Sequence, residues 1–114
     1  MEQGKINWTG ASGTKYLFTI YPKDTSFNEV DGNYIFARFS GNSWQAVYIG
    51  EGNLAIRTKD PGHQQCAQKK GFTHYHVHVN ENETARRAEE SDLILGNPEC
   101  LEENGGCNQT KTGK

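Results

Sequence analysis

A hairpin signal at residues 33–50 constrains the fold of this chain more than any other feature of its sequence. Two runs rich in β-branched and aromatic residues, NYIFARF (33–39) and WQAVYIG (44–50), flank the segment Ser40-Gly41-Asn42-Ser43. Two strand patterns separated by a few turn residues that include Gly-Asn are typical of a β-hairpin. We therefore predict two antiparallel strands in the middle of the chain.

Two more segments carry strand patterns. KYLFTIYP (15–22) mixes aromatic and β-branched residues and ends at a proline, which is typical of a first or edge strand. THYHVHV (73–79) alternates strictly, so one strand face carries His74, His76 and His78 and the other carries apolar residues. Both segments are predicted as strands.

The three histidines allow more than one interpretation. They spread over about 13 Å along a strand, and no acid or cysteine in the run completes a Zn²⁺ or Ni²⁺ site. A structural or substrate-facing role is therefore favoured for His74, His76 and His78. Metal binding by the histidines, or a patch that binds phosphate when protonated, stays open.

Helix signals follow the hairpin. Asn53 is an N-cap candidate before Leu54, so a short helix is expected to begin there. Asp60-Pro61-Gly62 predicts a stop, after which residues 63–71 are expected to form one or two helical turns that end at Gly71.

A longer helix is predicted before the C-terminal tail. Asn80 and Glu83 have the spacing of a capping box, and the helix they begin is expected to end at Gly96, just before a proline. Residues 99–114 are polar and rich in glycine, so we expect an irregular tail that frays near Lys114.

Composition limits the chain to a single small domain. A domain of 114 residues with a 33% hydrophobic fraction has room for one economical core, which is typical of an α/β or α+β domain. No apolar stretch approaches the roughly 18 residues that span a bilayer, and the N-terminus lacks the order of a signal peptide. A cytosolic location without membrane contact is the resulting expectation.

The cysteines are interpreted as reduced thiols. Cys66, Cys100 and Cys107 are odd in number and unclustered, which fits neither a disulfide framework nor a zinc site built from CxxC pairs. Isolated thiols stay reduced in the cytosol.

The charge balance excludes a generally basic nucleic-acid binder, since the formal net charge is −2. Cations gather in two local clusters, namely Arg57, Lys59, Lys69 and Lys70, and Arg86 and Arg87. A phosphate partner would have to be held at such a cluster, although charge alone favours the simpler explanation of a solvated face.

One acidic residue lies on the apolar side of the predicted last helix. Glu90 precedes Leu93 and Ile94 by three and four residues and therefore shares their side of the helix. A simple ion pair with Arg86 or Arg87, one turn earlier, would explain an acid at this position.

Taken together, these elements resemble the GIY-YIG nuclease family. Gly32-Asn33-Tyr34 and Tyr48-Ile49-Gly50 lie on the two hairpin strands, Arg57 lies on the following helix, and Glu90 lies ahead of the apolar pair in the last helix. The resemblance covers about residues 15–98, and the elements occur in the family's order. The family's pattern is altered at Asn33, where the middle residue is polar, and the spacing from Gly50 to Arg57 is one residue shorter than expected.

The resemblance implies a GIY-YIG endonuclease-like fold over residues 1–114. It consists of a small central antiparallel or mixed sheet of three strands flanked by helices, with an extra N-terminal strand. It also implies hydrolysis of phosphodiester bonds with Mg²⁺ or Mn²⁺.

Residue by residue, the resemblance implies a set of catalytic groups. Tyr34 matches the tyrosine that activates the attacking water or acts as general base, and Tyr48 matches the tyrosine beside it. Arg57 matches the arginine that binds the scissile phosphate, whose planar fork fits two phosphate oxygens. Glu90 matches the carboxylate that holds the metal, and a single carboxylate suits Mg²⁺ because this ion keeps most of its waters. His63 corresponds to a histidine that often follows the arginine.

A second set of residues is expected to contact the substrate. Asn108 corresponds to an asparagine that follows the acidic helix in relatives, and Gly50, Arg38 and Lys59 complete this set.

Two functions from different classes follow as hypotheses. The first is a metal-dependent endonuclease acting on nucleic acid, with DNA favoured over RNA. The second is a catalytically weak or inactive domain of the same fold that binds nucleic acid or protein. The chain has no separate targeting module, so a protein partner could supply specificity, and the oligomeric state is open.

Overall fold

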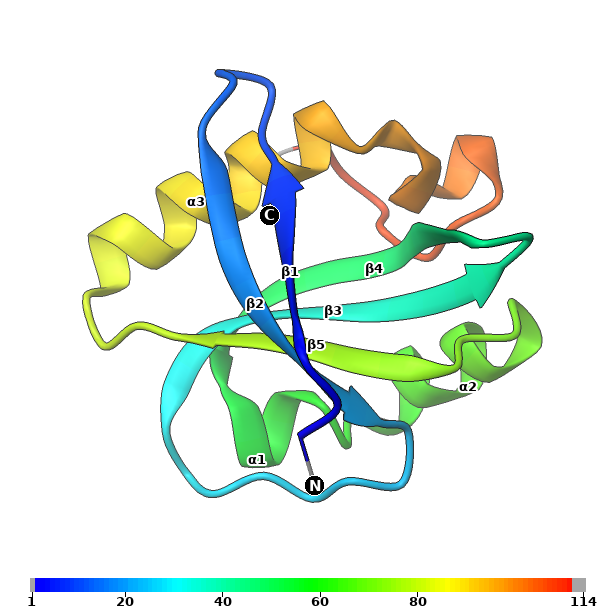
Figure 1. Ribbon diagram of the computed structural model, residues 1–114, viewed down its shortest axis with the longest axis horizontal. Helices are drawn as coiled ribbons and strands as arrows, with labels where there is room; N and C mark the ends of the chain where they lie inside the picture. Colours follow the sequence, from blue (N-terminus) through cyan, green and yellow to red (C-terminus); the bar gives the residue numbers. More distant parts are fainter. Residues whose placement is uncertain (1, 112–114) are drawn as a thin grey trace.

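The computed structural model describes residues 2–111, which form one antiparallel sheet of five strands in the order β1-β2-β5-β3-β4 (Figure 1). The strands are β1 (Lys5–Thr9), β2 (Lys15–Pro22), β3 (Asp31–Ser40), β4 (Ser43–Asn53) and β5 (His74–Val79). The helices are α1 (Leu54–Arg57), α2 (Pro61–Lys69) and α3 (Glu83–Gly96), followed by the 3-10 turns η1 (Pro98–Cys100) and η2 (Glu102–Asn104). The mixed α+β class is confirmed.

The predicted hairpin is present as β3 and β4. Its turn residues Gly41 and Asn42 both have positive φ, +60° and +66°, as a type I′ turn requires. A register shift between Phe36 and Ala37 places a bulge in the pair, so Tyr34 pairs with Gly50 and Phe36 with Tyr48. Partners in an antiparallel pair share a face, so both motif tyrosines lie on the same side of the sheet.

The sheet has more strands than the sequence predicted. In place of three strands with one N-terminal addition, β1 pairs with β2 as a second hairpin, and β2 joins the rest of the sheet through β5. The β1 segment KINWT has only one buried residue, Trp8. A short strand with one inward residue gives a weak period-two pattern, which explains why β1 was missed.

Helix α2 begins earlier than predicted. Asp60 is its N-cap and accepts a hydrogen bond from the His63 backbone N–H at 3.1 Å, while Pro61 occupies the first turn. Proline is favoured there because its missing N–H would have no partner in any case. The segment read as a stop is therefore the start of α2, whereas the predicted cap of α1 by Asn53 is confirmed.

The start of α3 is shifted by two residues. Asn82 is the N-cap, and its side chain accepts a hydrogen bond from the Ala85 backbone N–H. The Asn80 side chain accepts from the Asn82 backbone N–H just before the helix. The predicted end at Gly96 is confirmed. No helix within residues 2–111 is long and apolar enough to cross a bilayer.

Two apolar clusters cover the two faces of the sheet. One contains Leu93 and Ile94 of α3 together with Phe18, Ile35 and Ile49 of the sheet. The other contains Leu54 of α1, Ala67 of α2 and the aromatic residues Tyr34, Phe36 and Tyr75. The sheet thus separates α3 from α1 and α2, which lie on opposite sides of it in Figure 1.

The tail is ordered as far as it is described, contrary to the prediction of an irregular segment. Beyond η1 and η2, the Cys107 backbone N–H donates to the Val47 carbonyl at 2.8 Å, which covers the outer edge of β4. The expected fraying near Lys114 lies outside the described residues.

A disulfide joins Cys66 of α2 to Cys107 of the tail, with Cα atoms 6.0 Å apart. Cys100 is a buried free thiol. The prediction of three reduced thiols is therefore wrong for two of them. The pair is 41 residues apart in sequence, and only the packing of α2 and the tail around β4 brings it together. Reduced thiols accordingly no longer support a cytosolic location.

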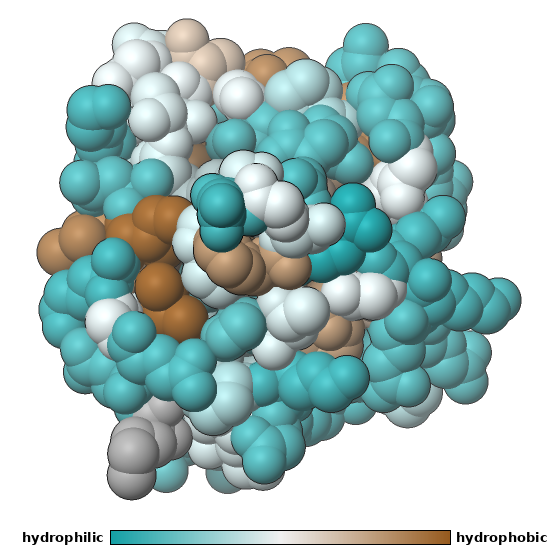
Figure 2. All heavy atoms as spheres, turned by 45° about the vertical axis from the view of Figure 1, so that its right-hand side comes forward, coloured by the Kyte–Doolittle hydropathy of each residue, from teal (hydrophilic) through white to brown (hydrophobic). Residues whose placement is uncertain are grey.

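The side of the molecule that carries the β3–β4 turn and the end of α2 is mostly hydrophilic. Figure 2 brings this side forward, and its apolar areas are separate from one another.

Candidate functional site

Tyr34 and Tyr48 form a phenol pair on the α1 and α2 side of the sheet. Their ring centroids are 6.1 Å apart, and their side chains hydrogen-bond to each other. This bond raises the pKa of Tyr34 and lowers that of Tyr48, while burial raises both more strongly. Tyr34 is 1% exposed and Tyr48 is only partly buried, so Tyr48 is the member of the pair that meets solvent.

Gly50 makes room for this pair. A Cβ at residue 50 would lie 2.5 Å from both Oη and Cζ of Tyr34. Real Cβ atoms do not approach so closely, because van der Waals contact begins about 1 Å further out. The Tyr34 phenol thus packs directly against the backbone of Gly50, in the space that a Cβ would fill. This structural role of the glycine was not predicted, and its predicted contact with substrate stays a prediction.

Arg57 is the last residue of α1, and its charge acts on the phenol pair. Burial raises the pKa of Tyr34 and Tyr48, and the Arg57 guanidinium opposes this rise. The same charge adds to the lowering of the His63 pKa, so the cation is within electrostatic range of all three residues. The residue is exposed, and within residues 2–111 it takes part in no ion pair. The shorter spacing from Gly50 therefore leaves Arg57 beside the tyrosines, with its charge available.

His63 lies in the first turn of α2 and stacks on Tyr48, with ring centroids 4.2 Å apart and planes 28° apart. Burial lowers the pKa of His63 most strongly, and the Arg57 charge lowers it further. Asp60 opposes this shift, since its Oδ2 lies 3.4 Å from His63 Nδ1. The imidazole is therefore neutral at pH 7, so His63 is itself a base within the site.

Glu90 completes the group from α3. The residue is 7% exposed, and its charge raises the pKa of both Tyr48 and Tyr34. A carboxylate on α3 thus lies within electrostatic range of phenols on the other face of the sheet. Four residues predicted as catalytic, Tyr34, Tyr48, Arg57 and His63, lie together on the α1 and α2 side of the sheet, whereas Glu90 lies on α3 and its charge acts on the phenols across the sheet.

The protonation of the phenols is set mainly by burial. Desolvation raises the pKa of Tyr34 well above its usual 10 and raises that of Tyr48 to about 12. Both phenols are therefore protonated at neutral pH. A phenolate here requires further positive charge beyond Arg57.

The donor set is consistent with Mg²⁺ or Mn²⁺ rather than with a closed metal site. Within residues 2–111 no three His, Cys, Asp or Glu side chains gather as ligands. Mg²⁺ does not need such a cage, because it keeps several waters and binds through one or two carboxylates and substrate phosphate oxygens. Glu90 of α3 is the carboxylate predicted to hold the ion, and this role stays a prediction.

Three residues predicted to contact the substrate lie elsewhere. Lys59 donates to the Thr25 carbonyl at 2.8 Å and to the Tyr75 hydroxyl at 3.2 Å. Arg38 is at the far end of β3, where its Nε donates to Gln45 at 3.2 Å. Neither cation is shown beside the phenol pair.

Asn108 is buried, and its side chain forms two hydrogen bonds with the backbone of Ile49, the middle residue of the Tyr-Ile-Gly motif. Its Oδ1 accepts from the Ile49 backbone N–H at 2.8 Å, and its Nδ2 donates to the Ile49 carbonyl at 2.9 Å. The side chain thus satisfies the outer edge of β4 as a paired strand would. This contact fixes the motif strand, and the predicted contact of Asn108 with substrate stays a prediction.

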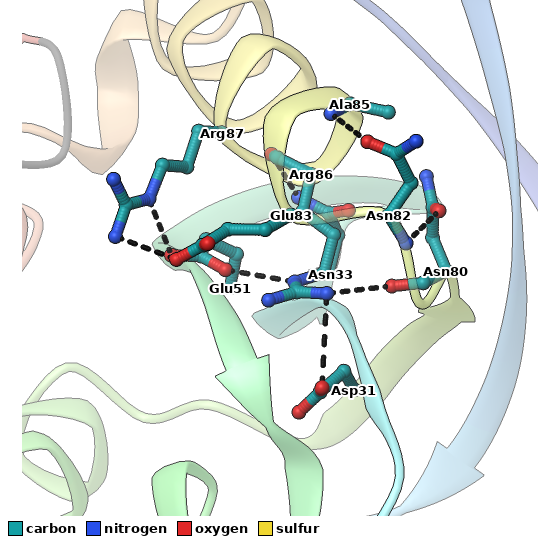
Figure 3. Close-up of polar contacts among 9 residues, drawn as sticks. All are labelled: Asp31, Asn33, Glu51, Asn80, Asn82, Glu83, Ala85, Arg86 and Arg87. Carbon is teal, nitrogen blue, oxygen red and sulfur yellow. Dashed lines mark hydrogen bonds and ion pairs between the residues drawn. The ribbon is translucent and has the colours of Figure 1, made fainter.

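A polar network that was missed in the sequence ties α3 to the motif strands (Figure 3). Asn33 Nδ2 donates to the Arg86 carbonyl at 3.0 Å, and Arg86 Nε donates to Glu51 at 2.9 Å. Arg87 also pairs with Glu51 at 3.8 Å and with Glu83 at 2.8 Å. The signal in the sequence was Asn33, a polar residue beside the apolar run of β3. Its side chain binds α3, the helix that carries Glu90.

The histidine strand has structural partners. His76 is fully buried and accepts from Trp8 Nε1 at 2.9 Å, while His78 Nδ1 lies 2.9 Å from Glu89. His74 contacts the Thr73 hydroxyl at 2.7 Å. These contacts support the structural interpretation of the three histidines.

Comparison of the chain with family models, with curated proteins and with solved structures found no match.

Proposed function

We propose that this protein is a metal-dependent nuclease of the GIY-YIG type that hydrolyses phosphodiester bonds in DNA. The meeting of Tyr34, Tyr48, Arg57 and His63 supports this proposal most strongly, because these residues come from β3, β4, α1 and α2, and the charge of Glu90 on α3 acts on the same phenols. Within residues 2–111 Arg57 has no carboxylate partner, so its guanidinium beside the two phenols would bind a phosphate.

In the proposed reaction, Arg57 binds two nonbridging oxygens of the scissile phosphate and stabilises the charge that grows on them. Tyr48 first gives its own proton to solvent, and the hydrogen bond from Tyr34 stabilises the resulting phenolate, which then takes a proton from the attacking water. The water oxygen bonds to phosphorus as the bond to the leaving oxygen breaks, and the leaving oxygen takes a proton from solvent.

Glu90 would hold Mg²⁺ or Mn²⁺, which supplies the extra positive charge that favours phenolate and stabilises the leaving oxygen. His63 holds the Tyr48 ring in place through its stacking contact. A partner protein that supplies sequence specificity belongs to the same proposal.

Cleavage of labelled DNA duplexes by the purified protein with Mg²⁺ or Mn²⁺ tests this function. The wild-type protein should cut, and Arg57→Ala and Glu90→Ala should each lose about 100-fold or more in rate. Lys15→Ala, an exposed cation on β2, is the matched control and should cut normally. Equal cleavage by all four proteins would refute the site.

The second candidate function is binding without catalysis. The raised pKa of both phenols favours it, because a neutral phenol pair is a poor base. Salt-dependent DNA binding that Arg57→Ala weakens, with no cleavage under any divalent metal, would support this function over the first.

A further inference from the structure

A pocket of about 310 Å³ lies at the opposite end of α2 from His63. Its polar lining consists of Arg38, Gln45, Lys69, Lys70, Glu99 and Asn104. The candidate site does not use this pocket, and the Arg38 side chain belongs to it rather than to the phenol pair.

The pocket carries an excess of positive charge. Within the described residues, Lys69 and Lys70 form no ion pair and no side-chain hydrogen bond, and the Arg38 guanidinium is held by Gln45 through Nε alone. Glu99 is the only carboxylate in the lining, and its Oε2 accepts from the Ala46 backbone N–H at 3.2 Å. Three cations therefore face one carboxylate that already has a donor.

Other cations of the chain are used differently. Arg86 and Arg87 are both paired with Glu51, and Arg87 with Glu83 as well. The two arginines of α3 are thus neutralised, whereas those of the pocket and of the candidate site, Arg38 and Arg57, lack a carboxylate partner within residues 2–111. A chain with net charge −2 keeps its unpaired arginines on the side of the sheet that carries the phenols.

One wall of the pocket is held in place. Asn104 donates to the Pro98 carbonyl at 2.9 Å, and the segment that contains it is tied to α2 through the Cys66–Cys107 disulfide. A wall that does not have to be ordered on binding reduces the entropy lost when a ligand enters. The surrounding face is mostly hydrophilic, as expected for a site that takes a charged ligand (Figure 2).

The pocket and the candidate site are connected by α2. His63 and Lys69 are six residues apart on this helix, which corresponds to about 9 Å at the usual rise of about 1.5 Å per residue. A DNA strand in a duplex advances about 3.4 Å per nucleotide along its axis and also turns around that axis, so a phosphate close to the cut one is the one that could reach the pocket.

We infer that the pocket lined by Arg38, Lys69 and Lys70 binds a backbone phosphate of the DNA strand close to the bond that is cut. This inference rests on the proposed function, and it assigns to the pocket the task of holding the strand in register along α2. The two phosphate sites together would fix both the position and the direction of the strand.

Binding of a fluorescein-labelled DNA duplex, measured without divalent metal over a series of salt concentrations, tests the inference. Lys69→Gln with Lys70→Gln should weaken binding about tenfold or more near 0.1 M salt and reduce the salt slope by roughly 0.9 for each lost phosphate contact. Arg38→Gln should act in the same direction. Lys5→Gln with Lys15→Gln removes the same charge from the β1–β2 hairpin and is the control.

Two outcomes would overturn the inference: equal binding by the pocket variant and its control, or no DNA binding by the wild-type protein. Failure of the proposed function has a different readout. Binding that depends on the pocket without any cleavage would retain the phosphate site and refute only the nuclease.

Discussion

At the scale of single residues, the two tyrosines are not equivalent. Tyr34 is buried against Gly50, while Tyr48 is partly exposed and stacks on His63. The resemblance assigns the activation of water to Tyr34, but the proposed mechanism gives this task to Tyr48 and makes Tyr34 a positioning residue.

Removal of the two hydroxyls separately distinguishes these roles. Tyr48→Phe should reduce the cleavage rate by about 100-fold or more at all pH values, because the base is lost. Tyr34→Phe removes the bond that lowers the pKa of Tyr48, so the rise of rate with pH should move to higher pH while cleavage persists. A pH–rate profile of each variant checks this, and the opposite pattern would return the base to Tyr34.

Gly50 is predicted to tolerate no side chain. Gly50→Ala places a methyl group 2.5 Å from the Tyr34 hydroxyl, so it should lower the free energy of unfolding by about 1–3 kcal/mol, as overpacking does. Gly62→Ala is the control, since its Cβ would meet nothing closer than Asp60 Oδ2 at 3.4 Å. Urea unfolding of both variants measures the difference, and equal stability would show that the phenol is not seated on Gly50.

At the scale of secondary-structure elements, α2 and the tail are held together around the outer edge of β4. Asn108 pairs with Ile49, and the Cys66–Cys107 disulfide joins the tail to the helix that carries both His63 and Lys69. On the other face, the Asn33–Arg86–Glu51 network fixes α3 (Figure 3). Two of the three helices that carry proposed site residues, α2 and α3, are therefore tied to the motif strands.

Loss of the disulfide should lower stability substantially. For a closed loop of 41 residues, the chain-entropy relation gives about 4 kcal/mol. Cys66→Ser with Cys107→Ser should lose up to this amount in urea unfolding, and dithiothreitol should destabilise the wild-type protein but not this variant. A wild-type protein that is unaffected by the reductant would contradict the bond.

Elements with strong local patterns could be predicted from the sequence. The β3–β4 hairpin has its turn residues, α1 has its Asn53 cap, and β5 alternates strictly, so each signal lies within a few residues. The start of α2 was misread because Asp60-Pro61 terminates one helix and begins another with the same chemistry. The disulfide and the Asn33 network depend on contacts between distant segments, which no local pattern specifies.

The same distinction applies to the candidate site. Tyr34, Tyr48, Arg57 and Glu90 were proposed as site residues because their motifs have a fixed order along the chain. The partners of Arg38 and Lys59 could not be predicted, because the partner of a cation depends on packing. Arg38 joins Lys69 and Lys70 in the pocket, and Lys59 joins Tyr75.

At the scale of the whole molecule, one sheet separates two environments. The face covered by α3 buries His76 beside Trp8, while the opposite face carries the phenol pair and the unpaired arginines. Burial lowers the pKa of His76 to about 3, and this shift makes global stability depend on pH.

The sign of that dependence follows from the shift. The unfolded chain binds a proton at His76 near pH 6.5, but the folded protein does so only near pH 3, so stability is complete above 6.5 and falls as the pH drops towards 3. The loss should approach about 1.4 kcal/mol per pH unit. His76→Gln keeps an acceptor for Trp8 and should lose this part of the slope; an unchanged slope in urea unfolding at pH 4–7 would contradict the burial of His76.

The central claim is that Tyr48, Arg57 and Glu90 act on one phosphate. A crystal structure of the protein with Mn²⁺ and a short DNA duplex carrying phosphorothioate linkages tests it most directly, since Mn²⁺ can be located by its anomalous scattering. The account predicts one Mn²⁺ on the Glu90 carboxylate, a backbone phosphate between it and the Arg57 guanidinium, and the Tyr48 hydroxyl within hydrogen-bond reach of that phosphate or its attacking water. DNA bound with no phosphate at Arg57, or Mn²⁺ bound away from Glu90, would contradict it.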